Sequence, residues 1–547
     1  MGIPLAAGIC WNVALTYLCI GHLNFVAVGF AAIIMGLGVD FAIHLYNRYL
    51  DLRVGGQEPA SAIEDALADT GPGIVTGALS TAGAFYAMMW VNFKGMREFG
   101  FITGSGVLLT LLVMTTLFPA MLLARERITG TYRPRRLRNF GINRWVAQVV
   151  RRPRLYFWGI VAVTVVLGFF AVQLRPADAL DLAKRAKLNP GVRWQLFLQD
   201  HLGSSFKSLM VVLHASDPRV VEAAGTRIYQ ELREFQRRGR IYLVESLFDY
   251  LPPREEQDRA LAAFAQALPP DRGAAVPEDL ARALDETGFD PAAFAGYQAA
   301  LAAALADPTP LSLEAISVSG DLKRIADRYL RRRAGDYWLA MYIYPRGKSF
   351  SQGELDLLQD RTASIRESSP AEVALVGGVI LNHTLKRLTQ TGFGAITALA
   401  VLTVVGLIFI HFRRIGLTLL TFSPLAVTAI WLGGLMYLLR EPITVMNLPV
   451  MPMLMGIGID DAIHVIHCHR HAGRGEVPRT FRLVGKAVVL TTLTTMVGFG
   501  SLALCNHPGL HSMGLLTVIG VFLALVTSAT LLPAVLTILP LPPDETP

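Results

Sequence analysis

Long apolar stretches alternate with short polar connections along most of the chain. Each stretch is near the roughly 20 residues that a membrane-spanning helix needs. They cover about ten segments: residues 2–20, 23–46, 72–92, 99–124, 155–174, 389–411, 415–438, 443–466, 484–505 and 512–538. A long polar region, 175–388, lies between 155–174 and 389–411. The pattern predicts an all-α membrane bundle of about ten transmembrane helices and one large domain outside the membrane.

Composition and charge support a membrane protein. Of the 547 residues 52% are hydrophobic and only 17% are charged, which excludes a set of ordinary soluble domains. Acidic and basic residues balance over 175–388, so the net charge of +8 arises elsewhere, largely in Arg-rich connections at 47–53, 125–154, 413–414 and 470–486. This positive-inside pattern places these connections and both termini in the cytoplasm, and it excludes a nucleic-acid partner.

The polar region then lies on the extracytoplasmic side. We expect strands at 208–214, 241–247, 337–344 and 372–376, and helices at 219–238 and 354–367, because β-branched runs flank amphipathic stretches there. Two β-α-β units of this kind predict an α+β domain with a ferredoxin-like fold. Residues 252–335 are rich in Ala, Pro and charge, which indicates an inserted helical hairpin or lid.

One short stretch occurs twice. Gly36–His44 reads GLGVDFAIH, and Gly456–His464 reads GIGIDDAIH. Further identities extend the repeat on both sides: Pro4 with Pro424, Thr81 with Thr495, Phe85 with Phe499, Gly106 with Gly520 and Pro119 with Pro533. The chain therefore contains two pseudo-symmetric halves.

The repeat divides the chain. Residues 1–124 are expected to form a first-half bundle of four helices, 125–154 a basic cytoplasmic connector, 155–174 a helix, 175–388 the extracytoplasmic domain and 389–540 a five-helix second half. Under this register Met1 aligns with Thr421, inside the stretch 415–438. We therefore expect the first half to lack one helix, one domain and a second helix.

The repeated stretch carries acids inside apolar runs. Asp40 and His44 are four residues apart and share one helix face, and Asp460 and His464 repeat this spacing. Asp461 stands where the first copy has Phe41. Acids within a membrane are by default functional, and an imidazole can pass a proton to them, so Asp40, His44, Asp460, Asp461 and His464 are predicted to form a proton relay. The alternative is that they are satisfied polar groups that fix helix register.

Hydroxyls and glycines surround these acids in sequence. The neighbouring apolar stretches carry Thr76, Ser80 and Thr81 in one half and Thr491, Thr492, Thr494 and Thr495 in the other. These hydroxyls either bond the carboxylates or bond back to their own helices. The glycines of the motif, Gly36, Gly38, Gly456 and Gly458, allow close helix approach, either for motion or for ordinary packing.

One stripe of residues has side chains that could bind a metal. His464, His467, Cys468 and His471 share a helix face, and imidazole with thiolate can bind zinc. A titratable rim at the cytoplasmic interface is the simpler interpretation, so we expect no metal site. The chain has no Gly-Lys-Ser/Thr phosphate loop. We expect no cofactor, with protons rather than ATP as the source of energy.

The chain resembles a known group of proteins. The two bundles with Gly-x-Gly-x-Asp, and the large extracytoplasmic loop, resemble the resistance-nodulation-division (RND) superfamily and in particular its MMPL branch of lipid exporters. The stretch Gly36–His44 and the loop Ser246–Gln257 are most similar to the RND transporters associated with hopanoid biosynthesis. The resemblance implies a porter-type periplasmic domain and proton-driven export of a hydrophobic or amphiphilic lipid from the bacterial inner membrane towards the outer membrane. The family's coupling acids fall on Asp40 and Asp460.

Two other functions fit parts of the sequence. A non-transporting, sterol-sensing lipid binder of the Patched type would share this bundle, and it would bind lipid without a pH gradient. An enzyme that uses the His/Cys stripe would need a metal, and we expect no enzyme activity. The predicted partners are the bilayer and a lipid substrate, with a homo-oligomer or the missing N-terminal half as further possibilities.

Overall fold

The computed structural model describes residues 1–24, 27–91, 93–129, 140–174, 208–268, 275–306, 309–318, 320–347, 349–472 and 476–539, with the isolated positions Trp194, Phe197 and His201. The chain divides into two compact units. One unit is Met1–Leu188 with Leu385–Pro547, and the other is Asn189–Thr384. The middle of the expected basic connector, 130–139, lies outside the described residues.

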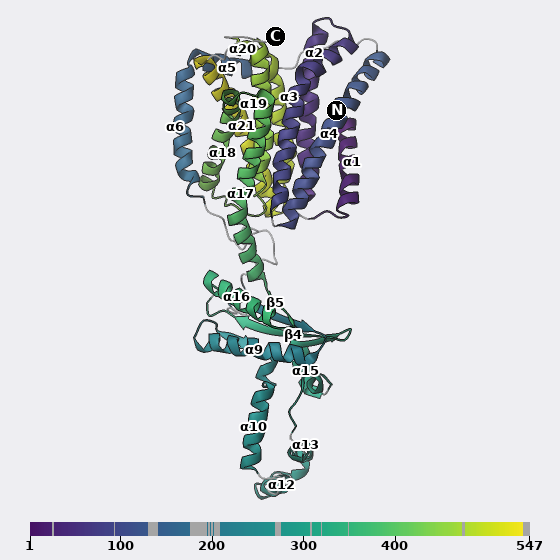
Figure 1. Ribbon diagram of the computed structural model, residues 1–547, viewed down its shortest axis with the longest axis vertical. Helices are drawn as coiled ribbons and strands as arrows, with labels where there is room; N and C mark the ends of the chain where they lie inside the picture. Colours follow the sequence, from purple (N-terminus) through teal and green to yellow (C-terminus); the bar gives the residue numbers. More distant parts are fainter. Residues whose placement is uncertain are drawn as a thin grey trace. The chain divides into compact units, whose positions relative to one another are not determined.

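The first unit is a helical bundle (Figure 1). Its helices are α1 (Gly2–Cys19), α2 (Phe30–Val54), α3 (Pro59–Ala87), α4 (Lys94–Thr129), α5 (Ile142–Arg151), α6 (Pro153–Ala171), α17 (Gly378–Phe412, in this unit from Leu385), α18 (Ile415–Leu438), α19 (Val450–Ala472), α20 (Val477–Ala503) and α21 (Pro508–Ile538). Short 3-10 turns, η1 (Ala27–Gly29) and η2 (Met88–Trp90), precede α2 and follow α3.

Nine helices of the described chain are long and apolar enough to cross a membrane. The expected span 72–92 corresponds to α3, which is not among the nine. The reason is its composition, because the Gly, Ser and Thr residues of α3 lower its mean hydropathy; the helix packs against α2, α4 and α19. The chain is a multi-pass membrane protein.

The two halves of the repeat pack across each other. Helices α1–α4 correspond in order to α18–α21, and α2 packs on α20 as α3 packs on α19. In Figure 1, α3 and α19 lie side by side near the middle of the unit. The matched phenylalanines Phe85 and Phe499 are both fully buried. The acid-bearing helices of each half therefore face helices of the other half.

Helices α2 and α19 extend beyond the expected apolar spans. Residues 47–53, expected in a connection, continue α2 to Val54, and α19 continues to Ala472. Polar partners stabilise this part of α2: Arg48 lies 2.6 Å from Asp69, and Lys486 lies 3.4 Å from Asp51.

Helix α5 is the described part of the basic connector. Its apolar side, Ile142, Val146 and Val149, is buried, and α5 packs against α20 and α21. The indole Nε1 of Trp145 donates to Thr530 Oγ1 at 3.2 Å. The connector is thus amphipathic, with its apolar side on the bundle itself.

The second unit contains the expected ferredoxin-like sheet. Its strands are β1 (Leu209–Ala215), β2 (Leu243–Glu245), β3 (Leu330–Arg333), β4 (Asp336–Tyr344) and β5 (Glu372–Val376). The order is β2-β4-β1-β5, and the strand pairs among the described residues are antiparallel. Helix α9 (Pro218–Arg237) packs on β1 and β4, and α16 (Gln352–Ser368) packs on β5. With β3 left out, this order is that of a ferredoxin-like fold.

Strand β3 is an addition to that fold. It pairs with β4 through Leu330↔Leu339 to Arg333↔Asp336. The two-residue loop between the strands, Ala334 and Gly335, has φ values of 54° and 93°, as a type I′ hairpin turn requires. The end of the expected helical insert, 252–335, is therefore a strand and a turn.

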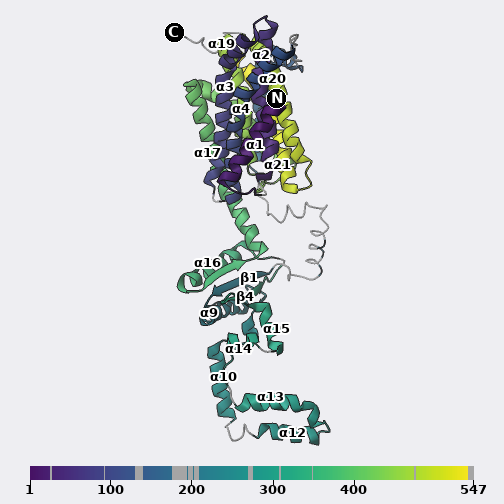
Figure 2. The same cartoon turned by 90° about the vertical axis from the view of Figure 1, so that its right-hand side faces the viewer.

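The rest of the insert is helical in its described parts. It contains α10 (Arg254–Ala267), α12 (Val276–Glu286), η5 (Pro291–Phe294), α13 (Ala295–Ala306), α14 (Leu313–Val318) and α15 (Gly320–Tyr329), and the short turn η4 (Leu247–Asp249) comes just before it. Figure 2 shows α10 leading away from the sheet towards α12 and α13.

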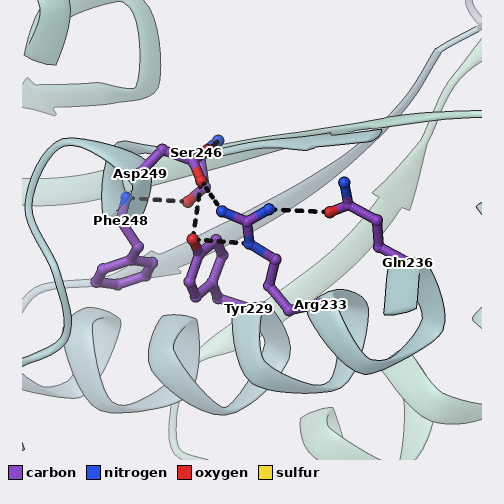
Figure 3. A network of polar contacts seen from close by, with 6 residues as sticks. All are labelled: Tyr229, Arg233, Gln236, Ser246, Phe248 and Asp249. Carbon is purple, nitrogen blue, oxygen red and sulfur yellow. Dashed lines mark hydrogen bonds and ion pairs between the residues drawn. The ribbon is translucent and has the colours of Figure 1, made fainter. Parts of the chain in front are cut away.

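A polar network holds η4, just before the insert, against α9 (Figure 3). Asp249 accepts hydrogen bonds from Tyr229 at 2.8 Å, from Arg233 at 2.7 Å and from the backbone N–H of Ser246 at 2.8 Å. Arg233 also donates to the Tyr229 hydroxyl at 2.9 Å. Burial, and then the hydrogen bond to Asp249, raise the pKa of Tyr229.

Candidate functional site

The acids of both repeats border one small cavity in the helical bundle. Asp40 from α2 and Asp460 and Asp461 from α19 line it, with Gly77 of α3 and Thr491 and Thr495 of α20. Its volume is about 20 Å³, which is room for about one water molecule. The four-residue spacing puts His44 and His464 at the same cavity, one helical turn beyond their acids. We call this space the acid cavity.

Asp40 receives hydrogen bonds from the other half of the repeat. Thr495 Oγ1 donates to Asp40 Oδ2 at 2.9 Å, and Thr494 Oγ1 lies 3.2 Å from Asp40 Oδ1. Thr494 also bonds back to its own helix at Leu490. Hydrogen bonds to a carboxyl and to the residue's own helix thus occur together at Thr494. Helix α20 holds the Asp40 carboxyl by two hydroxyl groups.

Asp460 has a different environment, although it matches Asp40 in the repeat. Its Oδ1 is buried and has no hydrogen-bond partner among the described residues. The carboxyl lies directly against Gly77 of α3, where a Cβ atom would collide with it. The two halves therefore hold their central acids unequally.

The hydroxyls predicted to support Asp460 do not reach it. Thr81 Oγ1 donates instead to the Gly456 carbonyl at 2.8 Å, and Ser80 Oγ is buried without a partner in the described part of the chain. Thr76 bonds His411 at 2.8 Å. Of the two uses expected for these hydroxyls, Ser80 and Thr81 show neither among the described residues, because Thr81 donates across to a backbone carbonyl of α19 and Ser80 has no partner.

The remaining hydroxyls bond within their own helix. Thr491 donates to the carbonyls of Ala487 and Val488, and Thr492 donates to the carbonyl of Val488. Their side chains nevertheless line the acid cavity.

The two histidines meet face to face. The rings of His44 and His464 are stacked, with centroids 3.9 Å apart and an interplanar angle of 13°. Each residue is only 7% exposed. The sequence predicted two separate Asp–His pairs, but it did not predict that the imidazoles of the two halves touch each other.

A second, larger cavity lies beyond the histidines. Its volume is about 410 Å³, and we call it the vestibule. Its lining combines charged and titratable side chains from α2, α3, α19 and α20 with a few apolar ones: His44, Asn47, Arg48, Asp51, Ala68, Asp69, Thr70, Pro72, His464, His467, Cys468, Arg479, Leu483, Val484 and Ala487. Arg48 and Asp69 have side chains 34% and 47% exposed, so the vestibule reaches the surface of the bundle.

The motif glycines lie at helix contacts. A Cβ atom at Gly456 would lie 2.7 Å from Thr81 Cα, and one at Gly36 would lie 3.4 Å from Thr495 Cα. Gly38 and Gly458 face matched partners, Leu5 with Thr110 and Leu425 with Ala524. These four glycines therefore set how closely neighbouring helices approach.

Two further glycines were missed by the sequence analysis. Gly73 and Gly77, four residues apart on α3, lie against the rings and carboxyl of His464 and Asp460, four residues apart on α19. A Cβ atom at Gly73 would lie 2.9 Å from His464 Cε1. The Gly-x-x-x-Gly spacing at 73–77 was the available signal.

The His/Cys stripe is spread over several environments. His464 stacks on His44, His467 lies 5.8 Å from His411 between ring centroids, and Cys468 lines the vestibule. The side chain of His471 lies outside the described residues. No group of three or more His, Cys, Asp or Glu residues in the described chain is placed to hold a metal ion.

Comparisons with known proteins agree with this architecture. The hopanoid transporter HpnN of Burkholderia multivorans is 24% identical over 97% of this chain and 62% of its own length, and HpnN of Rhodopseudomonas palustris is 23% identical over 95% and 62%. The chain thus spans 62% of the length of these relatives. The hedgehog release protein Disp of the water bear Hypsibius dujardini has the same fold, with a TM-score of 0.61 at 12% identity over 98% of this chain and 67% of that one.

A family model matches most of the sequence as well. It covers residues 2–156 and 337–540, and therefore includes both copies of the repeat, their acids and their histidines. The chain belongs to the MMPL family.

Proposed function

We propose that this protein uses the proton-motive force to export a hydrophobic or amphiphilic lipid of the hopanoid class from the bacterial inner membrane towards the outer membrane. The similarity to two hopanoid transporters over nearly the whole chain supports the cargo class. The sheet unit, Asn189–Thr384, is then the periplasmic domain through which the lipid passes. Protons are the coupling ion, and no cofactor, metal or enzymatic step takes part.

One observation carries the coupling step: Asp40 and Asp460 border the same cavity where helices of the two halves cross. A carboxylate in a membrane interior without a partner is costly, and a proton removes that charge. Protonation of Asp460 would change its contact with Gly77 of α3. The hydroxyls of α20 donate to Asp40 and stabilise its deprotonated form. Each acid can thus bias a contact between halves.

The other predicted members of the relay have defined parts in this proposal. Asp461 adds a third carboxyl to the acid cavity, and His44 and His464 stand between that cavity and the vestibule. A neutral imidazole can accept a proton at one ring nitrogen and release one from the other. The histidines would therefore pass protons to the acids.

The test is transport by the purified protein in proteoliposomes with an imposed pH gradient and a radiolabelled hopanoid. D40N and D460N are each expected to abolish gradient-driven movement of the lipid to acceptor vesicles. E64Q, at an exposed position of α3, is the matched control and is expected to retain it. Full gradient-driven transport by the D40N/D460N double variant would refute proton coupling through these acids. Lipid binding that ignores both the gradient and the substitutions would favour the sterol-sensing alternative.

A further inference from the structure

The acid cavity and the vestibule are separated at one place. Their linings have His44 and His464 in common, and these two residues form the stacked pair. On one side of the pair lie Asp40, Asp460 and Asp461. On the other side lies a cavity about twenty times larger, about 410 Å³ against about 20 Å³. The imidazole pair is thus the wall between the three acids and a space that reaches the surface.

Helix α3 lies directly against the His464 ring of the pair. Gly73 of α3 leaves room for the His464 ring, whose Nδ1 would lie 3.0 Å from a Cβ at that position. Thr76, one turn along α3, is hydrogen-bonded to His411 of α17 and does not hold either ring. Stacking therefore positions the two imidazoles more than hydrogen bonds do, and a stacked pair can separate by rotation about the side-chain torsions.

The vestibule has the character of a water-filled entrance. The charged and titratable groups that line it come from every helix around it: Arg48 and Asp51 from α2, Asp69 from α3, His467 from α19 and Arg479 from α20. Arg48 and Asp69 form an ion pair at the exposed end, and Lys486 pairs with Asp51 deeper in the bundle. Polar walls of this kind retain water, unlike an apolar cavity.

We propose that the His44–His464 stack is a gate, which closes the acid cavity to the vestibule while the rings are stacked and opens it when they separate. The gate deepens the function proposed above, because it decides when the acids of that site exchange protons with the vestibule. Its existence as a barrier does not depend on which ion or lipid is transported. Access from the vestibule is therefore tested without cargo and without a gradient.

The experiment measures access to a thiol placed behind the gate. Thr491 lines the acid cavity and Cys468 lines the vestibule, so T491C is made in a chain that keeps Cys468 and has Cys10, Cys19 and Cys505 replaced by Ser. The purified protein is treated with a small water-soluble methanethiosulfonate, and mass spectrometry follows modification at both positions. Cys468 reports in every variant that the protein is folded and that reagent has reached the vestibule.

We expect Cys468 to be modified while the T491C thiol is protected. H44A and H464A remove one ring of the stack, and each is expected to raise modification at position 491 to the rate of Cys468. H44F keeps a stacked ring without a titratable nitrogen and is expected to keep the protection. H411A removes a histidine that lines neither cavity, and it is also expected to keep the protection.

Two results would overturn the gate. One is equal modification of both thiols with the histidines unaltered, and the other is continued protection in both H44A and H464A while Cys468 reacts normally. Either result leaves the roles of Asp40 and Asp460 in transport intact. Loss of proton coupling in the transport assay, with the thiol result as expected, would instead reject the proposed function and keep the barrier.

Discussion

Thr495 donates a hydrogen bond of 2.9 Å to the carboxyl of Asp40, whereas its partner in the repeat, Thr81, donates one of 2.8 Å to the Gly456 carbonyl. The two threonines occupy the same position in sequence and make the same helix contact. Thr495 also lies 3.5 Å from the carbonyl of Gly36, the match of Gly456, so the two threonines differ in the additional bond of Thr495 to a carboxyl. The two halves are thus alike in packing and unlike in the way their acids are held.

Removing the hydroxyl of Thr495 should therefore affect the site more than removing that of Thr81. T495V takes away a donor to a carboxyl group, and hydrogen bonds to charged groups contribute about 1.5–3 kcal/mol. We expect gradient-driven lipid transport to fall by roughly tenfold or more in T495V, since 1.4 kcal/mol corresponds to tenfold. T81V is the matched control and is expected to lose less than T495V in the same proteoliposome assay. Equal effects would show that the bond to Asp40 has no special role.

Substituting the motif glycines by Ala should destabilise the protein more where the helix contact is closer. A Cβ at Gly456 would lie 2.7 Å from Thr81 Cα, which is backbone and cannot move alone, whereas at Gly36 the corresponding distance is 3.4 Å. G456A is expected to cost about 1–3 kcal/mol through overpacking, and G36A less. Thermal unfolding of the two purified variants in detergent measures this. A lower transition temperature for G36A than for G456A would contradict it.

Gly77 is expected to be essential to transport for a steric reason. G77A places a methyl group against the Asp460 carboxyl, which must then move out of the acid cavity. We expect G77A to abolish gradient-driven transport in the proteoliposome assay. G71A, on the same helix where a Cβ meets nothing within 4 Å, should retain normal transport. Normal transport by G77A would show that transport does not require the Asp460 carboxyl to lie where it does in the acid cavity.

The Asp249 network is expected to fix the segment that leads into the helical insert. D249A removes the acceptor shared by Tyr229, Arg233 and the Ser246 amide, and we expect a loss of about 1–3 kcal/mol in local stability. Hydrogen–deuterium exchange of the full chain should show faster exchange over residues 243–251. D258A, an exposed aspartate on α10, should leave exchange there unchanged. Unchanged protection in D249A would contradict this role.

The sheet unit should show a pH-dependent contribution from Asp336. Ser216 Oγ donates to Asp336 at 2.6 Å, and this bond, followed by the contact with His214, holds the pKa of Asp336 below its ordinary value of 3.8. A lowered pKa of an acid stabilises the folded state above the ordinary value, and that stabilisation disappears as the pH falls below it. S216A should therefore reduce the exchange protection of β1 at pH 5–7, and the difference should shrink below about pH 4. A pH-independent difference would contradict it.

The sequence was sufficient for the elements and for the acids. Apolar length predicts most helices, β-branched runs predict β1, β2, β4 and β5, and the repeat identifies Asp40 and Asp460 as a matched pair. These features depend on local pattern or on self-similarity, which a single chain displays. Strand β3 was missed, because Leu330–Arg333 carries three successive arginines and has no alternating pattern of its own.

The sequence does not predict which helices of the two halves pack against each other. The repeat shows that α2 matches α19, but not that α20 packs on α2 and α3 on α19. The stacking of His44 on His464 and the unequal bonding of Asp40 and Asp460 follow from that crossing. Gly73 and Gly77 were overlooked for the same reason, because their role appears only when the side chains of α19 are placed against α3.

Helix α3 has glycines, without side chains, where it contacts Asp460 and His464. This restricts whether one repeat could replace the other. At the matching positions of α20 the chain has Ala487 and Thr491 in place of Gly73 and Gly77. A chimaera built from two copies of the second repeat would bring the Thr491 side chain into the volume that the Asp460 carboxyl occupies. Although the halves share one pattern, the second repeat cannot take the place of the first unless the Asp460 carboxyl moves.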